Sequence, residues 1–352
     1  MTLRRGRPLP CCILLHPGAA ACELDVVSRS IHVLNPARPL AWPWCSGGLR
    51  GRHGCAATGA PPRVRRLLAA GGRRQVDPIG TRPAALFCLA MAPGRSRFSM
   101  AGKTAMITGA SSGFGAHFAR VLADEGAQLV LAARREDRLV SLADELRSRG
   151  AEVVTVVMDV ADRASIIAAF DQAEAALGNA RVIDVLINNA GIAKPNLALR
   201  TTAEEFDELM GTNLRGAFFV AQEVCTRLVA AGKPGCVVNI SSILGQRPGT
   251  QQSTYGAAKA ALDQLTRVLA LELSRNHVRV NGLAPGYFAT EMNADFFDTE
   301  RGRRYIDDRF VTKRLGALHE LDGALLLLAS DAGSFISGQT LAIDGGHLQS
   351  AL

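Results

Sequence analysis

No apolar run in this 352-residue chain approaches the roughly 20 residues that a membrane-spanning helix needs, so we expect no membrane partner. Lysine is missing from residues 1–98, which hold fifteen arginines and only three acids and carry a net charge of +12. Because the whole chain carries +8, residues 99–352 carry −4. They show no basic stripe with interleaved aromatic residues, so we expect no nucleic-acid partner either.

Cysteine is scarce after residue 98, where only Cys225 and Cys236 occur. Two thiols in so long a segment suit a reducing compartment, and we expect a cytoplasmic protein without a disulfide framework. The six earlier cysteines lack the paired C-x-x-C spacing of a zinc site. We therefore expect no metal.

Regular periodicity is absent from residues 1–98, which contain eleven of the fifteen prolines. This segment fits a disordered arginine-rich tail, or a targeting peptide whose apolar part is interrupted by proline and histidine. It also fits upstream sequence read from a misplaced start, because arginine without lysine is typical of GC-rich codons. We expect the third case, with Met91 or Met100 as the true start, and an unstructured extension over 1–98 in any case.

From residue 103 onward, short apolar segments alternate with helical ones. Strands are expected at 104–109, 127–133, 152–160, 181–191, 235–242, 277–286 and 339–346. Helices are expected at 114–127, 135–150, 162–178, 202–232, 254–275 and 321–331, with a looser region at 287–313. Continuous apolar strands between helices predict an α/β fold with a doubly wound, Rossmann-type parallel sheet. Residues 99–352 would form this single domain, and its ligands would bind beyond the carboxyl ends of the strands.

A glycine-rich turn, TGASSGFG at 108–115, joins the first strand to the first helix. Its glycines, Gly109, Gly113 and Gly115, have the spacing G-x-x-x-G-x-G. Glycine lets the backbone turn tightly and approach a pyrophosphate, while the helix N-terminus offers free N–H groups. The position between a strand and a helix therefore predicts a dinucleotide site.

The second strand ends at Ala133, where a carboxylate would hold the ribose 2′-hydroxyl of NAD. Arg134 and Arg135 follow instead, and arginine pairs with a 2′-phosphate. This favours NADP(H) over NAD(H). The alternative is that the two arginines are the solvated start of a helix, where cations are otherwise disfavoured.

Polar and turn-forming residues also stand at the ends of the later strands. They are Asp159 and Val160, the NNAG motif at 188–191, Ser241 and Ser242, and the PGYFAT motif at 285–290. Each suits an ordinary turn. Their occurrence together at the ends of successive strands indicates a ligand-binding site.

The stretch STYGAAK places Tyr255 and Lys259 four residues apart, on one face of the helix expected over 254–275. By itself this spacing is typical of a packing pair on an amphipathic helix. Following a strand that ends in serine, it becomes a candidate acid–base pair.

Together these motifs resemble the short-chain dehydrogenase/reductase family over nearly all of residues 101–347. Ser242 precedes Tyr255 by thirteen residues, the family spacing, which selects Ser242 over Ser241. The resemblance implies the catalytic set Asn213, Ser242, Tyr255 and Lys259. The expected cofactor contacts are Gly109, Ser111, Ser112, Gly113, Phe114, Gly115, Arg134, Arg135, Asp159, Val160, Asn189, Ala190, Gly191, Tyr255, Lys259, Pro285, Gly286 and Thr290. The tail SFISGQTLAIDGG resembles the family's subunit-contact region, which implies a homotetramer.

In the mechanism that this resemblance implies, Tyr255 exchanges a proton with the substrate oxygen while a hydride moves to or from nicotinamide. We expect Lys259 to lower the pKa of the phenol, and Ser242 to donate a hydrogen bond to the same oxygen. Asn213 would interrupt its helix and hold a water that leads to Lys259. The reaction that this mechanism implies is the NADP(H)-dependent interconversion of a secondary alcohol and a ketone.

The substrate is left open by the sequence. The resemblance is to the 3-oxoacyl-carrier-protein reductase branch and to the gluconate or polyol dehydrogenase branch, which share these motifs. Arg301, Arg303 and Arg304 would meet an anionic substrate, or would form a solvated helix face. A non-catalytic NADP-binding or scaffold protein of this fold would be expected to lack part of the catalytic set, and all four members are present here.

Overall fold

The computed structural model of the protein describes residues 96–178, 181–290 and 294–350. The chain divides into two units, residues 1–82 and 83–352, and every described residue belongs to the second unit. Most of the extension predicted over 1–98 therefore lies outside the described residues. Within the described ranges, no helix is long and apolar enough to cross a membrane.

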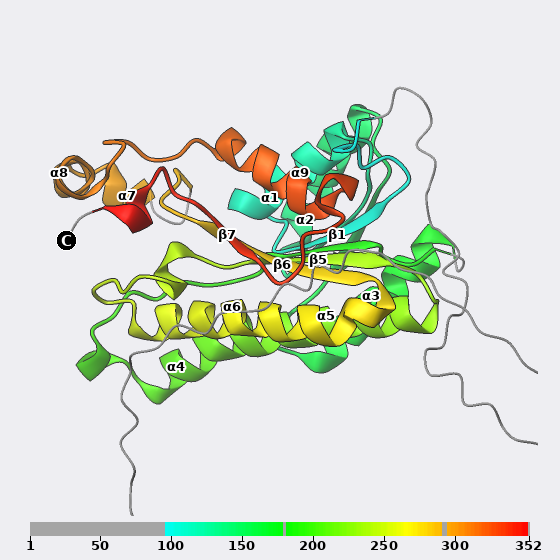
Figure 1. The fold of residues 1–352 in the computed structure, drawn as a ribbon, viewed down its shortest axis with the longest axis horizontal. Coiled ribbons are helices and arrows are strands. Elements are labelled where there is room, and N and C mark those ends of the chain that lie inside the picture. Colours follow the sequence, from blue (N-terminus) through cyan, green and yellow to red (C-terminus); the bar gives the residue numbers. More distant parts are fainter. Residues whose placement is uncertain (1–95, 179–180, 291–293, 351–352) are drawn as a thin grey trace, which may run out of the picture. The chain divides into compact units, whose positions relative to one another are not determined.

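The second unit is built on a parallel sheet of seven strands in the order β3-β2-β1-β4-β5-β6-β7 (Figure 1). The strands are β1 (Thr104–Thr108), β2 (Gln128–Ala133), β3 (Val153–Val157), β4 (Val185–Asn188), β5 (Gly235–Ile240), β6 (Val278–Pro285) and β7 (Thr340–Ile343). The order reverses between β1 and β4, which is where doubly wound sheets bind ligands. The predicted fold class is confirmed.

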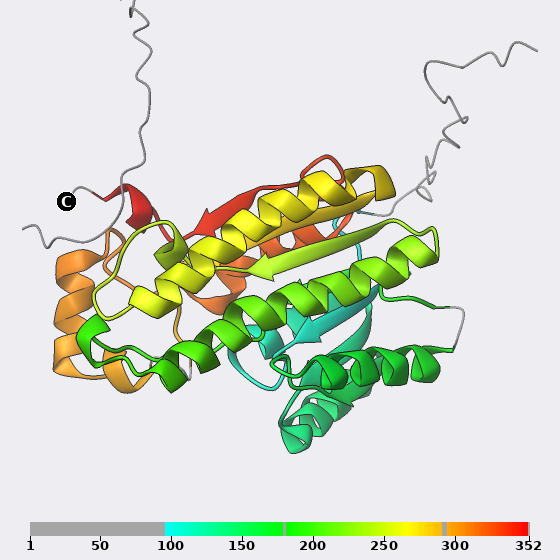
Figure 2. The ribbon, with the colours of Figure 1, turned by 90° about the horizontal axis from the view of Figure 1, so that it is seen from below.

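Helices cover both faces of this sheet (Figures 1 and 2). On one side lie α1 (Gly113–Asp124), α2 (Glu136–Ser148) and α9 (Asp322–Ala329). On the other side lie α3 (Arg163–Leu177), α4 (Ala203–Met210), α5 (Ala217–Ala230) and α6 (Ser253–Leu273). The short helices α7 (Ala294–Phe297) and α8 (Glu300–Arg309) follow β6.

Two apolar cores form because successive strand side chains point to opposite faces of the sheet. Ile107 and Leu131 pack in the core beneath α1, α2 and α9, whereas their neighbours Met106 and Val130 pack in the core beneath α3 and α5. All four side chains are fully buried. This explains why the strands read as continuous apolar runs rather than as alternating ones.

Local sequence signals set several helix ends. Gly126, with φ of +86°, follows α1 and donates its N–H to the Ala123 carbonyl, as expected of a glycine that ends a helix. Thr202 and Glu205 form a reciprocal capping box at the start of α4. These signals can be read in sequence because they involve neighbours in the chain.

Two regions differ from the expected elements. The single helix expected over 202–232 is divided into α4 and α5 by a π-helical turn, Gly211–Gly216, in which Asn213 lies. Such turns often occur at functional sites. The looser region at 287–313 contains α7 and α8, and Thr299 caps α8 by accepting the Gly302 N–H. The apolar periodicity of α8 is weak because most of its side chains are exposed.

Candidate active site

A cavity of about 380 Å³ lies beyond the carboxyl ends of β1, β2, β4 and β5. All the predicted cofactor contacts except Gly115, Pro285 and Gly286 line it. Its lining also includes residues that sequence reasoning did not name, among them Met158, Ile192 and Thr212. Residues far apart in the chain thus meet at one edge of the sheet, as the strand order requires.

The glycine-rich turn needs glycine for two different reasons. Gly109 and Gly113 have φ of +67° and +53°, a region that other residues rarely adopt. A Cβ on Gly109 would also lie 2.9 Å from the Ala190 Cα, whereas a Cβ on Gly113 would meet nothing within 4 Å. The turn is therefore packed on the side of the sheet and open at the start of α1.

Three predicted contacts have structural positions outside the cavity. A Cβ on Gly115 would lie 2.3 Å from the Gly109 carbonyl oxygen, so this glycine allows α1 to pack against the turn. Pro285 pairs with Ile343 in the sheet. Gly286 donates its N–H to the Ile343 carbonyl at 2.8 Å, and a Cβ there would lie 2.8 Å from the Asp344 Cβ.

Arg135 connects the start of α2 to the glycine-rich turn. Its Nη2 donates to the hydroxyls of Ser111 at 2.9 Å and Ser112 at 2.8 Å. Arg134 beside it is exposed and also lines the cavity. A guanidinium and two hydroxyls beside the N-terminus of α1 can hold a phosphate group.

The end of β4 is fixed to β1 by one hydroxyl. Thr108 Oγ1 accepts the backbone N–H groups of Asn189 and Ala190, each at 2.9 Å. The Asn189 side chain donates in turn to the Thr108 carbonyl at 2.9 Å. The NNAG segment therefore forms a rigid wall of the cavity at the point where the strand order reverses.

Asn213 is buried, and its side-chain amide forms hydrogen bonds with the segment that follows this wall. Its Oδ1 accepts the Ile192 N–H and its Nδ2 donates to the Ile192 carbonyl, both at 2.8 Å. The π-helical turn brings this side chain to the loop that follows β4. The structure thus gives Asn213 a positioning role, because both ends of its amide group bind the backbone of Ile192.

The Tyr255 hydroxyl hydrogen-bonds with the hydroxyl of Ser242, which stands at the end of β5. Lys259, one turn along α6, is 4% exposed, and its Nζ donates to the Ile240 carbonyl at 2.7 Å. The lysine nitrogen lies 5.6 Å from the centre of the Tyr255 ring. Tyr255 and Lys259 line the cavity, whereas Ser242 and Asn213 stand behind its lining.

Burial raises the pKa of the Tyr255 phenol above its ordinary value, and the hydrogen bond with Ser242 only partly opposes this. The expected lowering of this pKa by Lys259 therefore stays a prediction, and in the protein by itself burial outweighs it. Burial also lowers the pKa of Lys259 to about 8, against the nearby negative charge of Asp263, which raises it. The ammonium is charged at neutral pH but is close to losing its proton.

Asp263 is a site residue that sequence reasoning missed. It is 4% exposed, and one carboxylate oxygen accepts the Thr340 hydroxyl of β7 at 3.3 Å. Ser241 hydrogen-bonds with the same carboxylate and lies 3.4 Å from the Lys259 carbonyl, which turns it toward the backbone of α6. The signal was present, because Asp263 follows Lys259 by four residues and so shares its helix face.

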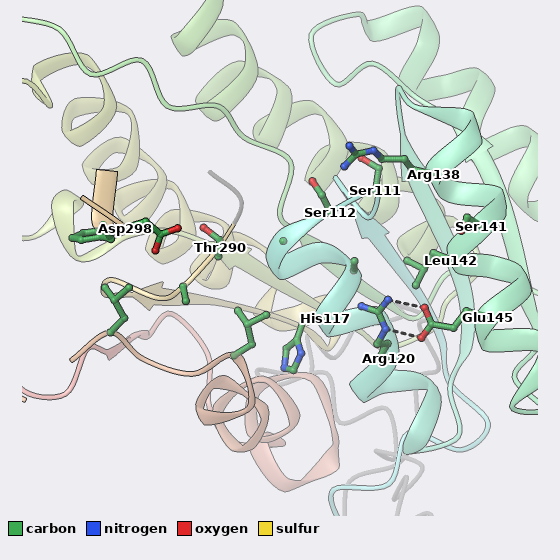
Figure 3. A pocket seen from close by; sticks show the side chains of 16 residues that line it. Ser111, Ser112, His117, Arg120, Arg138, Ser141, Leu142, Glu145, Thr290 and Asp298 are labelled. Atoms are coloured by element: carbon green, nitrogen blue, oxygen red, sulfur yellow. Dashed lines mark hydrogen bonds and ion pairs between the residues drawn. The ribbon is translucent and has the colours of Figure 1, made fainter. Parts of the chain in front are cut away.

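A second cavity, of about 640 Å³, adjoins the first (Figure 3). It shares Ser111, Ser112 and Thr290 with the first cavity, but none of the four predicted catalytic residues lines it. Arg120 on α1 and Glu145 on α2 form a bidentate ion pair at 2.6 and 2.7 Å on its wall. The smaller cavity is the one that combines the glycine-rich turn with Tyr255 and Lys259.

Comparisons with known proteins agree with this geometry. A family model described as enoyl-(acyl carrier protein) reductase matches residues 109–347. The chain is 38% identical to the gluconate 5-dehydrogenase of Gluconobacter oxydans over 251 residues, which are 71% of this chain and 96% of that protein. It is 35% identical to the 3-oxoacyl-[acyl-carrier-protein] reductase of Thermotoga maritima, over 70% of this chain and 97% of that protein.

Among solved structures, the chain is similar to a gluconate 5-dehydrogenase from Burkholderia cenocepacia in complex with NADP and tartrate. The TM-score is 0.69 and the sequence identity 37%, over 72% of this chain and 98% of that chain. The match spans nearly the whole relative, and it coincides with the seven-stranded sheet and the cavity at its edge. The protein belongs to the short-chain dehydrogenase/reductase family of oxidoreductases.

Proposed function

We propose that the protein is an NADP(H)-dependent oxidoreductase that interconverts the ketone and the secondary alcohol of a sugar acid. The observation that carries this proposal is the contact between the hydroxyls of Tyr255 and Ser242, with the Lys259 ammonium one helical turn away. This pair of hydroxyls can hold one substrate oxygen between them. The relatives named as gluconate 5-dehydrogenases support the sugar-acid class.

When bound, the nicotinamide cofactor supplies or accepts the hydride at the substrate carbon. In reduction, Tyr255 gives its proton to the substrate oxygen, and Ser242 donates a hydrogen bond to the charge that develops there. Lys259 stabilises the phenolate that remains, because its buried ammonium lies beside the ring. In oxidation the phenolate takes the proton back. Asn213 keeps the loop after β4 in place.

The predicted cofactor contacts would hold the dinucleotide along the smaller cavity. Gly113 leaves the open start of α1 for the pyrophosphate, and Arg135 with its two serine partners suits a phosphate group. The 2′-phosphate is the group that separates NADP from NAD, so this cluster supports a preference for NADP(H). The related structure from Burkholderia cenocepacia, which contains NADP, agrees with it.

A 3-oxoacyl thioester is a second candidate substrate. Tyr287, Phe297 and Phe310, which follow β6, form an aromatic cluster with ring centres 4.9 to 6.0 Å apart. Such a surface suits an acyl chain, and a reductase of that class is 35% identical to this chain. A scaffold role is disfavoured by the complete catalytic set.

The test is oxidation of NADPH by the full-length protein with 5-keto-D-gluconate, acetoacetyl thioesters and simple ketones. We expect the highest kcat/KM with 5-keto-D-gluconate, and a lower value with NADH than with NADPH. If no ketone accelerates NADPH oxidation above the rate of the Tyr255→Phe protein, the proposal is wrong. If the thioester is preferred by tenfold or more, the second candidate replaces the first.

The proposal includes a homotetramer in the cytoplasm. Leu271 on α6 and Phe335 before β7 are 77% and 104% exposed, and Leu341 lies on β7, the strand at the edge of the sheet. Exposed apolar side chains near an edge strand support subunit contacts there. The thiols Cys225 and Cys236 are free and buried, which suits a reducing compartment. Light scattering on the purified protein tests the tetramer.

A further inference from the structure

Arg247 lies in the loop that follows Ser242, five residues further along the chain. Its backbone N–H donates to the Ile243 carbonyl at 2.9 Å, and its side chain is half-buried. One nitrogen, Nη1, donates to the His347 carbonyl and to the Ser350 hydroxyl, each at 2.7 Å. These bonds attach the C-terminal segment to the loop that shapes the substrate end of the site.

The Arg247 guanidinium lacks a carboxylate partner among residues 96–178, 181–290 and 294–350. By contrast, Arg120, Arg227 and Arg314 each pair with a glutamate or an aspartate. Asp344 is the acid beside His347. Its two carboxylate oxygens accept the backbone N–H groups of Gly346 and Leu348, at 2.9 and 2.7 Å, rather than a hydrogen bond from Arg247.

Two nitrogens of the Arg247 guanidinium, Nε and Nη2, make no hydrogen bond to any described residue. They form the edge with which a guanidinium binds a carboxylate through two parallel bonds. A half-buried cation whose partners in the described part of the chain are neutral oxygens is suited to an arriving anion, because an unpaired buried charge is costly.

The C-terminal segment connects Arg247 to the catalytic tyrosine. The His347 ring packs edge-on against Tyr287 and Phe310, with centres 5.6 and 5.2 Å apart. Burial raises the pKa of the Tyr287 phenol most, the neighbouring Tyr305 raises it further, and the charge of Tyr255 adds the smallest contribution, so Tyr287 lies near the catalytic tyrosine. In Figure 1 the last short helix (red) lies beside α7 and α8. Arg247, His347 and Tyr287 are therefore linked by direct contacts that lead from the C-terminal segment toward Tyr255. Tyr287, Phe310 and His347 also line a small cavity of about 90 Å³, which none of the four predicted catalytic residues lines.

His347 carries an unused polar atom at this wall. Its Nδ1 is buried and has no hydrogen-bond partner among the described residues. Burial and the neighbouring Arg247 lower the pKa of the His347 imidazole, so the ring is neutral at physiological pH. The imidazole therefore adds no charge of its own beside the Arg247 guanidinium.

We propose that Arg247 binds the carboxylate of the substrate through its Nε–Nη2 edge. This rests on the proposed function and assigns its specificity for a sugar acid to one arginine of the loop after β5. The arginines of α8 are weaker candidates: Arg301, Arg303 and Arg304 are exposed, and Arg304 pairs with Glu300. Of the two alternatives for these three arginines, a solvated helix face is the one that fits the structure.

The test compares 5-keto-D-gluconate with L-sorbose, which has the same ketone and hydroxyl pattern but carries CH2OH in place of the carboxylate. For Arg247→Gln we expect the ratio of kcat/KM for the acid to that for the neutral ketose to fall by roughly 10- to 100-fold, chiefly through KM for the acid. Arg247→Lys keeps the positive charge, so its ratio of kcat/KM values should lie between those of the wild-type protein and Arg247→Gln. Arg304→Gln is the matched control and should leave the ratio unchanged.

A ratio within twofold of the wild-type value in Arg247→Gln would overturn the inference. So would an equal loss with both ketoses, because Arg247 would then act only by holding the C-terminal segment. Calorimetric binding of D-gluconate and D-glucitol to the NADP-loaded protein separates this result from failure of the proposed function. If the wild-type protein turns over neither ketose, preferential binding of gluconate that disappears in Arg247→Gln still supports the carboxylate site, and equal binding of both ligands overturns it.

Discussion

The side-chain nitrogen of Lys259 lies 5.6 Å from the centre of the Tyr255 ring and donates a 2.7 Å hydrogen bond to the carbonyl of Ile240. The last residue of β5 thus holds the ammonium in place against the sheet. In the proposed mechanism Lys259 would act on Tyr255 through its charge, because its hydrogen bond goes to the backbone. The proposed acid–base chemistry would therefore depend on whether Lys259 is protonated.

Replacing Tyr255 by phenylalanine should abolish turnover. The change removes the phenolic proton that Tyr255 places beside Ser242, and general acid catalysis contributes roughly 10²- to 10⁴-fold. Binding of NADPH should stay within a few-fold, because the ring and Lys259 remain. Stopped-flow turnover and a fluorescence titration of NADPH measure the two quantities. A variant with normal kcat would contradict the mechanism.

Reduction should slow as the pH rises through about 8, where buried Lys259 loses its proton and no longer stabilises the phenolate. Asp263 raises the pKa of Lys259, so Asp263→Asn should move this break to lower pH. The measurement is kcat for ketone reduction between pH 6 and 10 in both proteins. A break that moves to higher pH in Asp263→Asn would show that Asp263 does not act through Lys259.

Arg135→Gln should weaken the preference for NADPH. The variant loses the guanidinium that is held by Ser111 and Ser112, and a hydrogen bond to a charged group contributes roughly 1.5–3 kcal/mol. The ratio of kcat/KM with NADPH to that with NADH should fall by about tenfold or more. Arg149→Gln, at the opposite end of α2 and paired with Asp124, is the control. An unchanged ratio in Arg135→Gln would mean that the 2′-phosphate binds elsewhere.

Two glycines of the π-helical turn should respond to alanine in opposite directions. A Cβ on Gly216 would lie 2.6 Å from the Val160 carbonyl oxygen, so Gly216→Ala should lower the free energy of unfolding by roughly 1–3 kcal/mol. Gly211 is helical and has nothing within 4 Å of an added Cβ, so Gly211→Ala should raise it by about 0.5–1 kcal/mol. Denaturant unfolding of both variants measures this, and the same sign in both would refute the packing argument.

Much of the fold could be predicted because its signals are local. Apolar strands, Gly126 after α1 and the capping residues of α4 each depend on neighbours in the chain, and the strand order follows from parallel connections. The division of the helix over 202–232 required a resemblance, since the residues around Asn213 have no local breaker strong enough to predict a π turn. The bounds of α8 could not be set, because most of its side chains are exposed and few apolar residues mark its buried side.

The candidate site divides in the same way. The sequence by itself determined which residues stand at the strand ends: the glycine-rich turn, Arg135, Ser242, and Tyr255 with Lys259. Only the tertiary structure decided what surrounds them, namely that Lys259 and Asp263 are both buried and that the C-terminal His347 meets Arg247. Burial and charge–charge distance are properties of packing between distant segments. For that reason the pKa values, and the cation that we assign to the substrate carboxylate, could not be derived from residue order.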